Sequence, residues 1–267
     1  MIRLFDNAFS PFARKVRLVL EHKELAFEAL DGLAPEGRAQ LAALNPRVEV
    51  PVLQDGDLVV VNSSHIVAYL EHRYPARPVY PADPARRVAA LAWERLADTL
   101  VDAVLHGVSN GGFGFPDGVP PAGFVAAAGE DLEEVYGDLE RVLERTAFLC
   151  GDLSVADLAL FPHLTAVRFL GVSFDAAAYP RLLSWYQRLR GLPICRADLA
   201  RARAWLAAST GTRPANGRIV WRGDRIEWLL ARGFHDWLAR EIRGDRVAWP
   251  GRSGLAAAAA AGRPGRG

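Results

Sequence analysis

Two predicted helix starts carry the side chains whose types and positions suit chemistry. Ser10 precedes Pro11, so the serine can cap a helix whose first residue needs no N–H donor. Asn62 and Ser63 precede a second apolar helical pattern and can bond the free N–H groups of its first turn. A helix start favours an anionic group, so each serine is a candidate ligand contact. The alternative for each is a plain N-cap.

Val50-Pro51 is the third candidate, because a proline here opens a predicted strand. A cis bond before Pro51 would turn the carbonyl and N–H of Val50 outward beside the second helix cap, where a peptide-like ligand can dock. A trans proline that opens an edge strand is the alternative, and trans is the commoner form of X–Pro bonds.

Other reactive side chains suggest no separate site. His65 and His72 can share a helix face, but no third ligand lies nearby in the sequence, so no metal site is predicted. Cys150 and Cys195 have neither a zinc spacing nor a C-x-x-C spacing, and they suit a reducing compartment. The glycine-rich stretch 111–114 follows a helix rather than a strand, which argues against a phosphate cradle.

The candidate residues fall within a predicted β-α-β-α-β-β-α order, which is thioredoxin-like. The first two strands should be parallel, since a right-handed crossover through a helix joins them. Asp55-Gly56 should turn the hairpin. On the first helix, apolar residues share one face, and Arg14 and Lys15 are expected off it. The strands are predicted at 2–5, 27–30 and on both sides of the hairpin. The helices are predicted to start at Pro11, to cover 35–44, and to run from the cap at residues 62–64 as far as Tyr74.

The second half is predicted to be helical after a proline-rich linker. One long helix should end at a glycine- and proline-rich loop, 107–123. Ser154 and Asp157 suggest a capping box, and Pro162 should interrupt the helix that they start. The other helices are predicted at 124–148, 179–189 and 198–208.

A different composition begins near residue 213. We expect a strand at 218–222, a helix at 224–242 capped by Asp224, a strand at 246–249 and a frayed tail. Four of the seven tryptophans lie here, namely Trp221, Trp228, Trp237 and Trp249. The favoured interpretation is a layer that buries these rings against the main body. The alternative is a pocket lid or a docking surface for a partner.

Composition narrows the function classes. The chain has 267 residues, and 32 basic against 31 acidic residues give no basic field for nucleic acid. No apolar run reaches membrane-spanning length, and no signal peptide is apparent, so a cytoplasmic protein is expected. The predicted divisions are a thioredoxin-like domain at 1–76, a linker at 77–84, an all-α domain at 85–210, a small α/β extension at 211–252 and a tail at 253–267.

Three groups of residues resemble the cytosolic glutathione transferase family, in its serine-type form. They are Asn45-Pro46 through Leu53 with Asn62-Ser63-Ser64, the stretch Ser10 to Arg17, and Gly151 to Leu158 followed by Tyr179-Pro180. The resemblance covers about residues 1–210 in the family's order. It implies the glutathione transferase fold, in which the thioredoxin-like domain binds glutathione and the helical domain holds a small apolar electrophile.

The resemblance also implies roles for individual residues. Ser10 would stabilise the glutathione thiolate, the main chain of Val50 would bond the cysteinyl backbone, and Ser63 would receive a carboxylate. Glutathione is the expected co-substrate, with no other cofactor or metal, and a homodimer is expected. The glutathione-binding positions are Glu49, Val50, Pro51, Asn62 and Ser63, and the second-substrate pocket is placed at Phe12, Trp93, Thr99 and His106.

Two positions depart from the family's pattern. Glu49 stands where the family most often has a lysine, and Asn62 stands where it usually has a glutamate. Loss of each ion pair would weaken glutathione binding by about 1 kcal/mol. The alternatives are therefore a non-catalytic interaction module or a site for another γ-glutamyl thiol. The absence of a cysteine at position 10 argues against thiol–disulfide chemistry.

Overall fold

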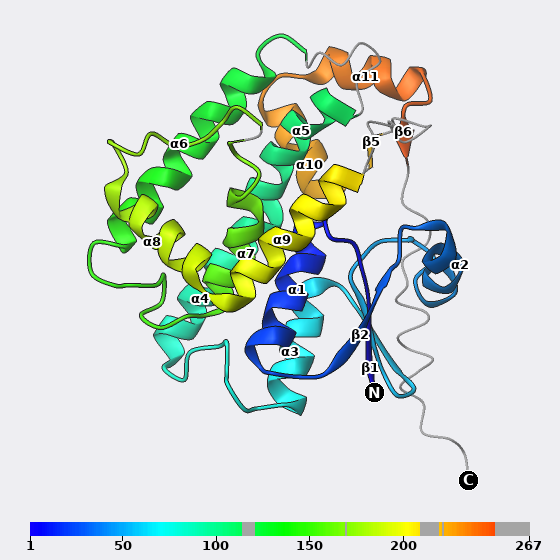
Figure 1. The fold of residues 1–267 in the computed structure, drawn as a ribbon. Coiled ribbons are helices and arrows are strands. Elements are labelled where there is room, and N and C mark those ends of the chain that lie inside the picture. The colour runs from blue at the N-terminus through cyan, green and yellow to red at the C-terminus, as the bar shows by residue number, and fades with distance from the viewer. Residues whose placement is uncertain (114–120, 169, 209–218, 221, 249–267) are drawn as a thin grey trace. The chain divides into compact units, whose positions relative to one another are not determined.

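The computed structural model describes residues 1–267 except 114–120, 169, 209–218, 221 and 249–267. The chain forms two compact units (Figure 1). The first contains residues 1–80 and 191–208, and the second contains 81–190 and the described part of 209–250. Residues 191–208, which the sequence analysis assigns to the helical domain, therefore group with the N-terminal unit.

A four-stranded sheet forms the centre of the first unit, in the order β2-β1-β3-β4. β1 is parallel to β2, which confirms the predicted crossover, and β3 is antiparallel to both β1 and β4. Leu4 lies opposite Ala29 on one side and Leu53 on the other. The strands are β1 (Ile2–Asp6), β2 (Phe27–Asp31), β3 (Val52–Asp55) and β4 (Leu58–Val61).

Four helices complete this unit, and α1 and α3 lie on one side of the sheet with α2 on the other (Figure 1). α9 packs beside α1. It starts at Pro193 rather than at the predicted Asp198, because a proline in the first turn needs no hydrogen-bond donor. The helices are α1 (Pro11–His22), α2 (Pro35–Leu44), α3 (Ser63–Arg73) and α9 (Pro193–Ala208).

Helices dominate the second unit. α4 runs through a π-helical segment, η1, into α5, so the predicted loop at 107–123 is wrong as far as residue 113. Gly107 is a helical residue here, and its missing side chain leaves room for the ring of Trp228. The elements are α4 (Pro84–Leu96), η1 (Ala97–Val101), α5 (Asp102–Phe113), α6 (Phe124–Val142), α7 (Val155–Leu164) and α8 (Pro180–Gly191).

Two predicted helix boundaries in this unit are wrong. α6 ends at Val142 instead of residue 148, because the chain then folds into a tight turn in which Phe148 pairs with Gly151. α7 continues past Pro162 to Leu164, since the proline lies near the helix end and the whole helix is buried. The capping box is confirmed, with the Ser154 N–H donating to Asp157 Oδ2 at 2.9 Å.

The extension forms two short helices and a parallel strand pair. The single predicted helix at 224–242 is wrong, because Gly233 adopts a positive φ of 79° and separates two helices. Arg222, not Asp224, occupies the N-cap position. The elements are β5 (Ile219–Val220), α10 (Gly223–Ala231), α11 (His235–Arg243) and β6 (Val247–Ala248).

The expected burial of the extension's tryptophan rings is confirmed for Trp228. This ring is buried and lies edge-on to Phe124 of α6, at 5.8 Å between ring centroids. Trp237 also contacts Phe124, at 5.1 Å. Trp221, Trp249 and the predicted tail lie outside the described residues. Among the helices that the structure describes, none is long and apolar enough to cross a membrane.

Candidate functional site

Ser10 caps α1 as predicted, with an extended backbone. Its Oγ accepts a hydrogen bond from the Ala13 N–H at 3.4 Å, and its own N–H donates to the Asn7 carbonyl at 3.0 Å. A hydroxyl oxygen can accept from a backbone N–H while its proton points elsewhere. The Ser10 proton is therefore available for an anion at the start of α1.

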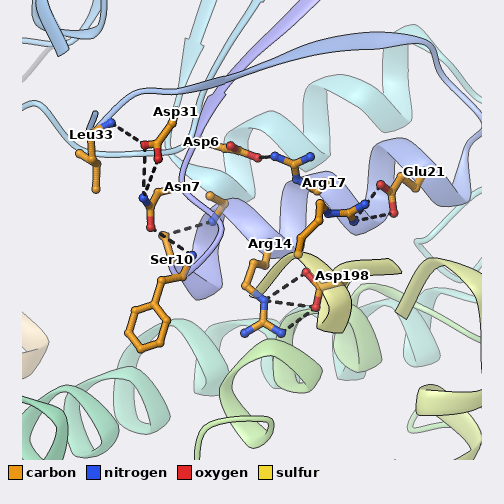
Figure 2. Close-up of polar contacts among 12 residues, drawn as sticks. Asp6, Asn7, Ser10, Arg14, Arg17, Glu21, Asp31, Leu33 and Asp198 are labelled. Carbon is orange, nitrogen blue, oxygen red and sulfur yellow. Dashed lines mark hydrogen bonds and ion pairs between the residues drawn. The ribbon is translucent and has the colours of Figure 1, made fainter. Parts of the chain in front are cut away.

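The turn before Ser10 is held by Asn7 and Asp31 (Figure 2). Asn7 Nδ2 donates to both carboxylate oxygens of Asp31, at 3.2 and 3.3 Å, and Asn7 Oδ1 accepts from the Phe9 N–H at 3.0 Å. Asp31 lies at the end of β2, next to the strand that leads into this turn. The sequence analysis did not single out either residue, because 24 positions separate them.

The bond between Val50 and Pro51 is cis, the form that the docking hypothesis requires. Pro51 is buried and Val50 is half-buried, directly before β3. The side chain of Asn45 supports this segment by donating to the Glu49 carbonyl at 3.0 Å.

Glu49 is paired within its own loop. Arg47 donates to the two oxygens of its carboxylate, from Nε at 2.8 Å and from Nη2 at 2.9 Å. The hydrogen bonds to Glu49 raise the pKa of Arg47 above its usual value, so this guanidinium stays charged. The two side chains therefore add no net charge to the surface beside Val50.

Asn62 and Ser63 begin α3. Asn62 has a φ of 75°, and its Oδ1 accepts from the Ser64 N–H at 3.0 Å, so the predicted cap is Asn62. Ser63 is the first helical residue and is buried. Lys15 Nζ donates to Ser64 Oγ at 3.4 Å, which brings a cation to this helix start. Lys15 and Arg14, which the sequence pattern places off the apolar face of α1, are both buried, because α3 and α9 cover the sides of α1.

Three aromatic rings lie near Ser10, two of them through their place in the sequence and one through its contact with Phe9. The ring of Phe9 stacks on that of Trp205 from α9, with 5.2 Å between centroids and an interplanar angle of 19°. Phe12, on the first turn of α1, is half-buried. The sequence offers no signal for Trp205, because only the packing of α9 on α1 brings it to this turn.

The remaining predicted pocket residues belong to the second unit, so the first unit gathers only part of the predicted set. Trp93 is half-buried on α4. Thr99 Oγ1 donates to the Arg95 carbonyl at 2.8 Å within the helical backbone. His106 Nε2 lies 3.3 Å from Arg225 Nη1, which comes from the extension. A pocket role for these three residues stays a prediction.

His106 belongs to a group of polar side chains around the buried carboxylate of Asp102, in which His106 and Arg225 are half-buried. Arg225 donates from Nε to Asp102 Oδ2 at 2.9 Å and from Nη2 to Oδ1 at 3.2 Å. Burial and the neighbouring charge of Arg225 lower the pKa of His106 to about 3. Burial alone would raise the pKa of Asp102, but Arg225, with smaller effects of His163 and His106, brings it below the usual value. His106 is therefore neutral and Asp102 ionised near pH 7.

Two family models match this chain. The model of the glutathione S-transferase N-terminal domain matches residues 4–78, and that of the C-terminal domain matches residues 122–188. Glutathione S-transferase 1 of Manduca sexta is 30% identical over 208 residues, covering 73% of this chain and 90% of that protein. The chain belongs to the glutathione S-transferase family.

Other similar proteins are covered to a comparable extent. A pyrimidodiazepine synthase from Drosophila melanogaster is 29% identical over 209 residues, or 72% of this chain and 78% of that protein. A solved glutathione S-transferase of Methylobacillus flagellatus with GSH bound is 27% identical, with a TM-score of 0.64, over 74% of this chain and 98% of that one. These matches confirm the glutathione S-transferase fold and are consistent with a transferase.

Proposed function

We propose that this protein binds glutathione along Ser10, Val50 and Ser63 and transfers its sulfur to a small apolar electrophile. The observation that carries the proposal is the position of the Ser10 hydroxyl at the start of α1, in the same unit as Val50 and the start of α3. The family membership and the GSH-bound relative support the choice of thiol.

The chemistry follows from the helix start. A free thiol titrates near 8.5, and only the thiolate is a strong nucleophile. The α1 dipole contributes about 0.3–1 kcal/mol, and a hydrogen bond from Ser10 to a charged sulfur contributes about 1.5–3 kcal/mol. One pKa unit corresponds to about 1.36 kcal/mol, so the two together lower the thiol pKa by about one to three units.

The reaction itself needs no redox partner. The thiol proton leaves to solvent, and the sulfur lone pair attacks an electrophilic carbon of the acceptor. The bond from that carbon to its leaving group breaks, and the leaving group departs with the bonding pair. Ser10 keeps its own proton throughout and acts by donating a hydrogen bond to the sulfur.

The departures from the family pattern at Glu49 and Asn62 weaken glutathione binding less than the residue types alone suggest. Arg47 neutralises Glu49, so no unpaired carboxylate repels the glycyl carboxylate of glutathione. Asn62 still caps α3 and leaves Ser63 as the first helical residue. Lys15, bonded to Ser64, adds a positive charge that favours the γ-glutamyl carboxylate.

Calorimetric titration with glutathione tests binding, and the Ser10→Ala variant tests catalysis. With a chloronitrobenzene-type acceptor, kcat/KM should fall about ten- to a hundredfold, because one hydrogen bond to charge is lost. The apparent pKa of the bound thiol, followed by thiolate absorbance against pH, should rise in parallel. Ser184→Ala, an exposed serine on α8, is the matched control and should leave both values unchanged. An unchanged rate in Ser10→Ala would remove this residue from the mechanism.

The second candidate function is a non-catalytic interaction module, which the residue types at Glu49 and Asn62 favour. No heat with millimolar glutathione would support it over the enzyme. Heat with another γ-glutamyl thiol, but none with glutathione, would support a different co-substrate.

A homodimer and a cytoplasmic location complete the proposal, and both rest on the family. Val88 and Leu91 lie three residues apart on α4 and are exposed in the single chain, as a subunit contact would require. Light scattering of the purified protein tests this, and a monomer at all concentrations would contradict it.

A further inference from the structure

Asn7 connects the strand β1 to the cap of α1 through three of its atoms. Its carbonyl accepts from the Ser10 N–H at 3.0 Å, and its Oδ1 accepts from the Phe9 N–H at 3.0 Å. Its Nδ2 donates to Asp31. Asn7 is also buried, at 6% exposed, whereas Asp31 is exposed, so the bonds between them are part-buried. The backbone of the turn that presents Ser10 is therefore fixed by one side chain.

Asp31 is itself fixed at the end of β2. Its Oδ1 accepts from the N–H groups of Leu33 and Ala34, at 3.0 and 3.2 Å (Figure 2). The adjacent Gly32 N–H donates to the Asp6 carbonyl at 2.8 Å. Asp31 thus gives Asn7 a stationary acceptor and sets which end of the amide faces Phe9.

We propose that Asn7 and Asp31 are positioning residues for the Ser10 hydroxyl, which they aim at the glutathione sulfur. The inference rests on the proposed function of Ser10 and adds two residues to it. Neither touches glutathione. They act because only an amide offers a donor to Asp31 and an acceptor to Phe9 at the same time.

The hydrogen bonds between Asn7 and Asp31 allow a specific test, in which the amide and the carboxylate exchange positions. Asn7→Asp places two carboxylates together and breaks the link, whereas Asp31→Asn removes the charge but keeps an amide oxygen that can accept from Asn7. The double variant Asn7→Asp/Asp31→Asn restores the link with donor and acceptor exchanged. The amide introduced at position 31 can donate to one oxygen of the carboxylate introduced at position 7, while the other oxygen accepts from the Phe9 N–H.

The measurements are the apparent pKa of the bound glutathione thiol, kcat, and the glutathione dissociation constant. Asn7→Asp should raise the thiol pKa by about one unit and lower kcat about tenfold at pH 6.5, with the dissociation constant changed less than threefold, and Asp31→Asn should have a smaller effect on both the thiol pKa and kcat. The double variant should recover kcat to within threefold of the parent. Asp57→Asn, an exposed acid in the hairpin turn, is the matched control and should match the parent.

The outcomes separate this inference from the proposed function. If Ser10→Ala raises the thiol pKa but folded Asn7→Asp does not, the positioning inference is overturned and the role of Ser10 stands. If Ser10→Ala has no effect, the proposed function of Ser10 fails first. Where a single variant does not fold by circular dichroism, the double variant decides, because a folded double variant with a raised thiol pKa contradicts the exchange.

Discussion

Arg14 of α1 and Asp198 of α9 form a buried ion pair across 184 positions of sequence, with 2.6 Å between Nη2 and Oδ2. The two side chains are only 6% and 2% exposed. A second bond from Arg14 Nε, 3.1 Å from Oδ1, makes the pair bidentate. This contact fastens α9 to the helix that begins at Ser10.

Asp198→Asn should therefore destabilise the protein strongly, because it leaves the Arg14 charge buried without its counterion. The expected loss in the free energy of unfolding is about 3–5 kcal/mol, measured by urea denaturation. Glu24→Gln removes one partner of an exposed pair with Arg77, whose side chains are 64% and 53% exposed, and should change stability by less than about 1 kcal/mol. Equal effects of the two substitutions would contradict this account of Arg14.

Gly107 on α5 should not tolerate a side chain. A Cβ there would lie 2.5 Å from Cζ3 of Trp228, so Gly107→Ala should lower the free energy of unfolding by about 1–3 kcal/mol. Gly137 on α6 has nothing within 4 Å of such a Cβ, and Gly137→Ala should stabilise by about 0.5–1 kcal/mol. Stabilisation by both substitutions would mean that Trp228 does not pack on α5.

Arg225→Met should destabilise the second unit by about 1–3 kcal/mol, because the buried Asp102 then keeps, among the described residues, only the longer ion pair with Arg222, 3.8 Å from Nη1 to Oδ2. Arg95, whose side chain is 77% exposed and 3.9 Å from Asp224, gives the control variant Arg95→Met, with a change below about 0.5 kcal/mol. Thermal and urea unfolding measure the change in the free energy of unfolding for both variants.

His106 should remain neutral from pH 8 to pH 5, since its pKa is lowered to about 3. In the unfolded chain the imidazole of His106 binds a proton near pH 6.5. The contribution of His106 to the free energy of unfolding is therefore complete above pH 6.5 and is lost as the pH falls toward 3. NMR titration of the imidazoles, with His106→Gln for assignment, measures this. A His106 signal that titrates near 6.5 would refute the half-buried, Arg225-bonded ring.

Asp6 should titrate about two units above an ordinary aspartate. Burial raises its pKa to about 6, although the charge and hydrogen bond of Arg17 oppose this. The folded protein then binds more protons than the unfolded chain between about pH 4 and 6, so this group lowers stability as the pH rises through that window. Carboxyl NMR should show the Asp6 pKa rising further in Arg17→Met, with no change in the exposed-arginine control Arg38→Met.

Local sequence determined much of the first unit. The strands of residues 2–61 and the starts of α1, α2 and α3 were predicted to within about two residues, because Pro11, Asp55-Gly56 and Asn62 act on their immediate neighbours. The same local chemistry predicted that Ser10 and Asn62 cap their helices and that Ser154 and Asp157 form a capping box. These features depend on hydrogen bonds within four residues.

The tertiary structure decided the features that depend on contacts between residues far apart in the sequence. Pattern alone places Arg14 and Lys15 off the apolar face of α1, and only the packing of α9 and α3 on α1 buries them. The need for a glycine at position 107 likewise comes from a tryptophan 121 positions later, because the ring of Trp228 leaves no room for a side chain there. Asn7 and Asp31 meet only because β1 and β2 pair in one register. A sequence pattern reports periodicity along one element, whereas burial, charge pairing and the aim of a catalytic hydroxyl depend on which elements become neighbours.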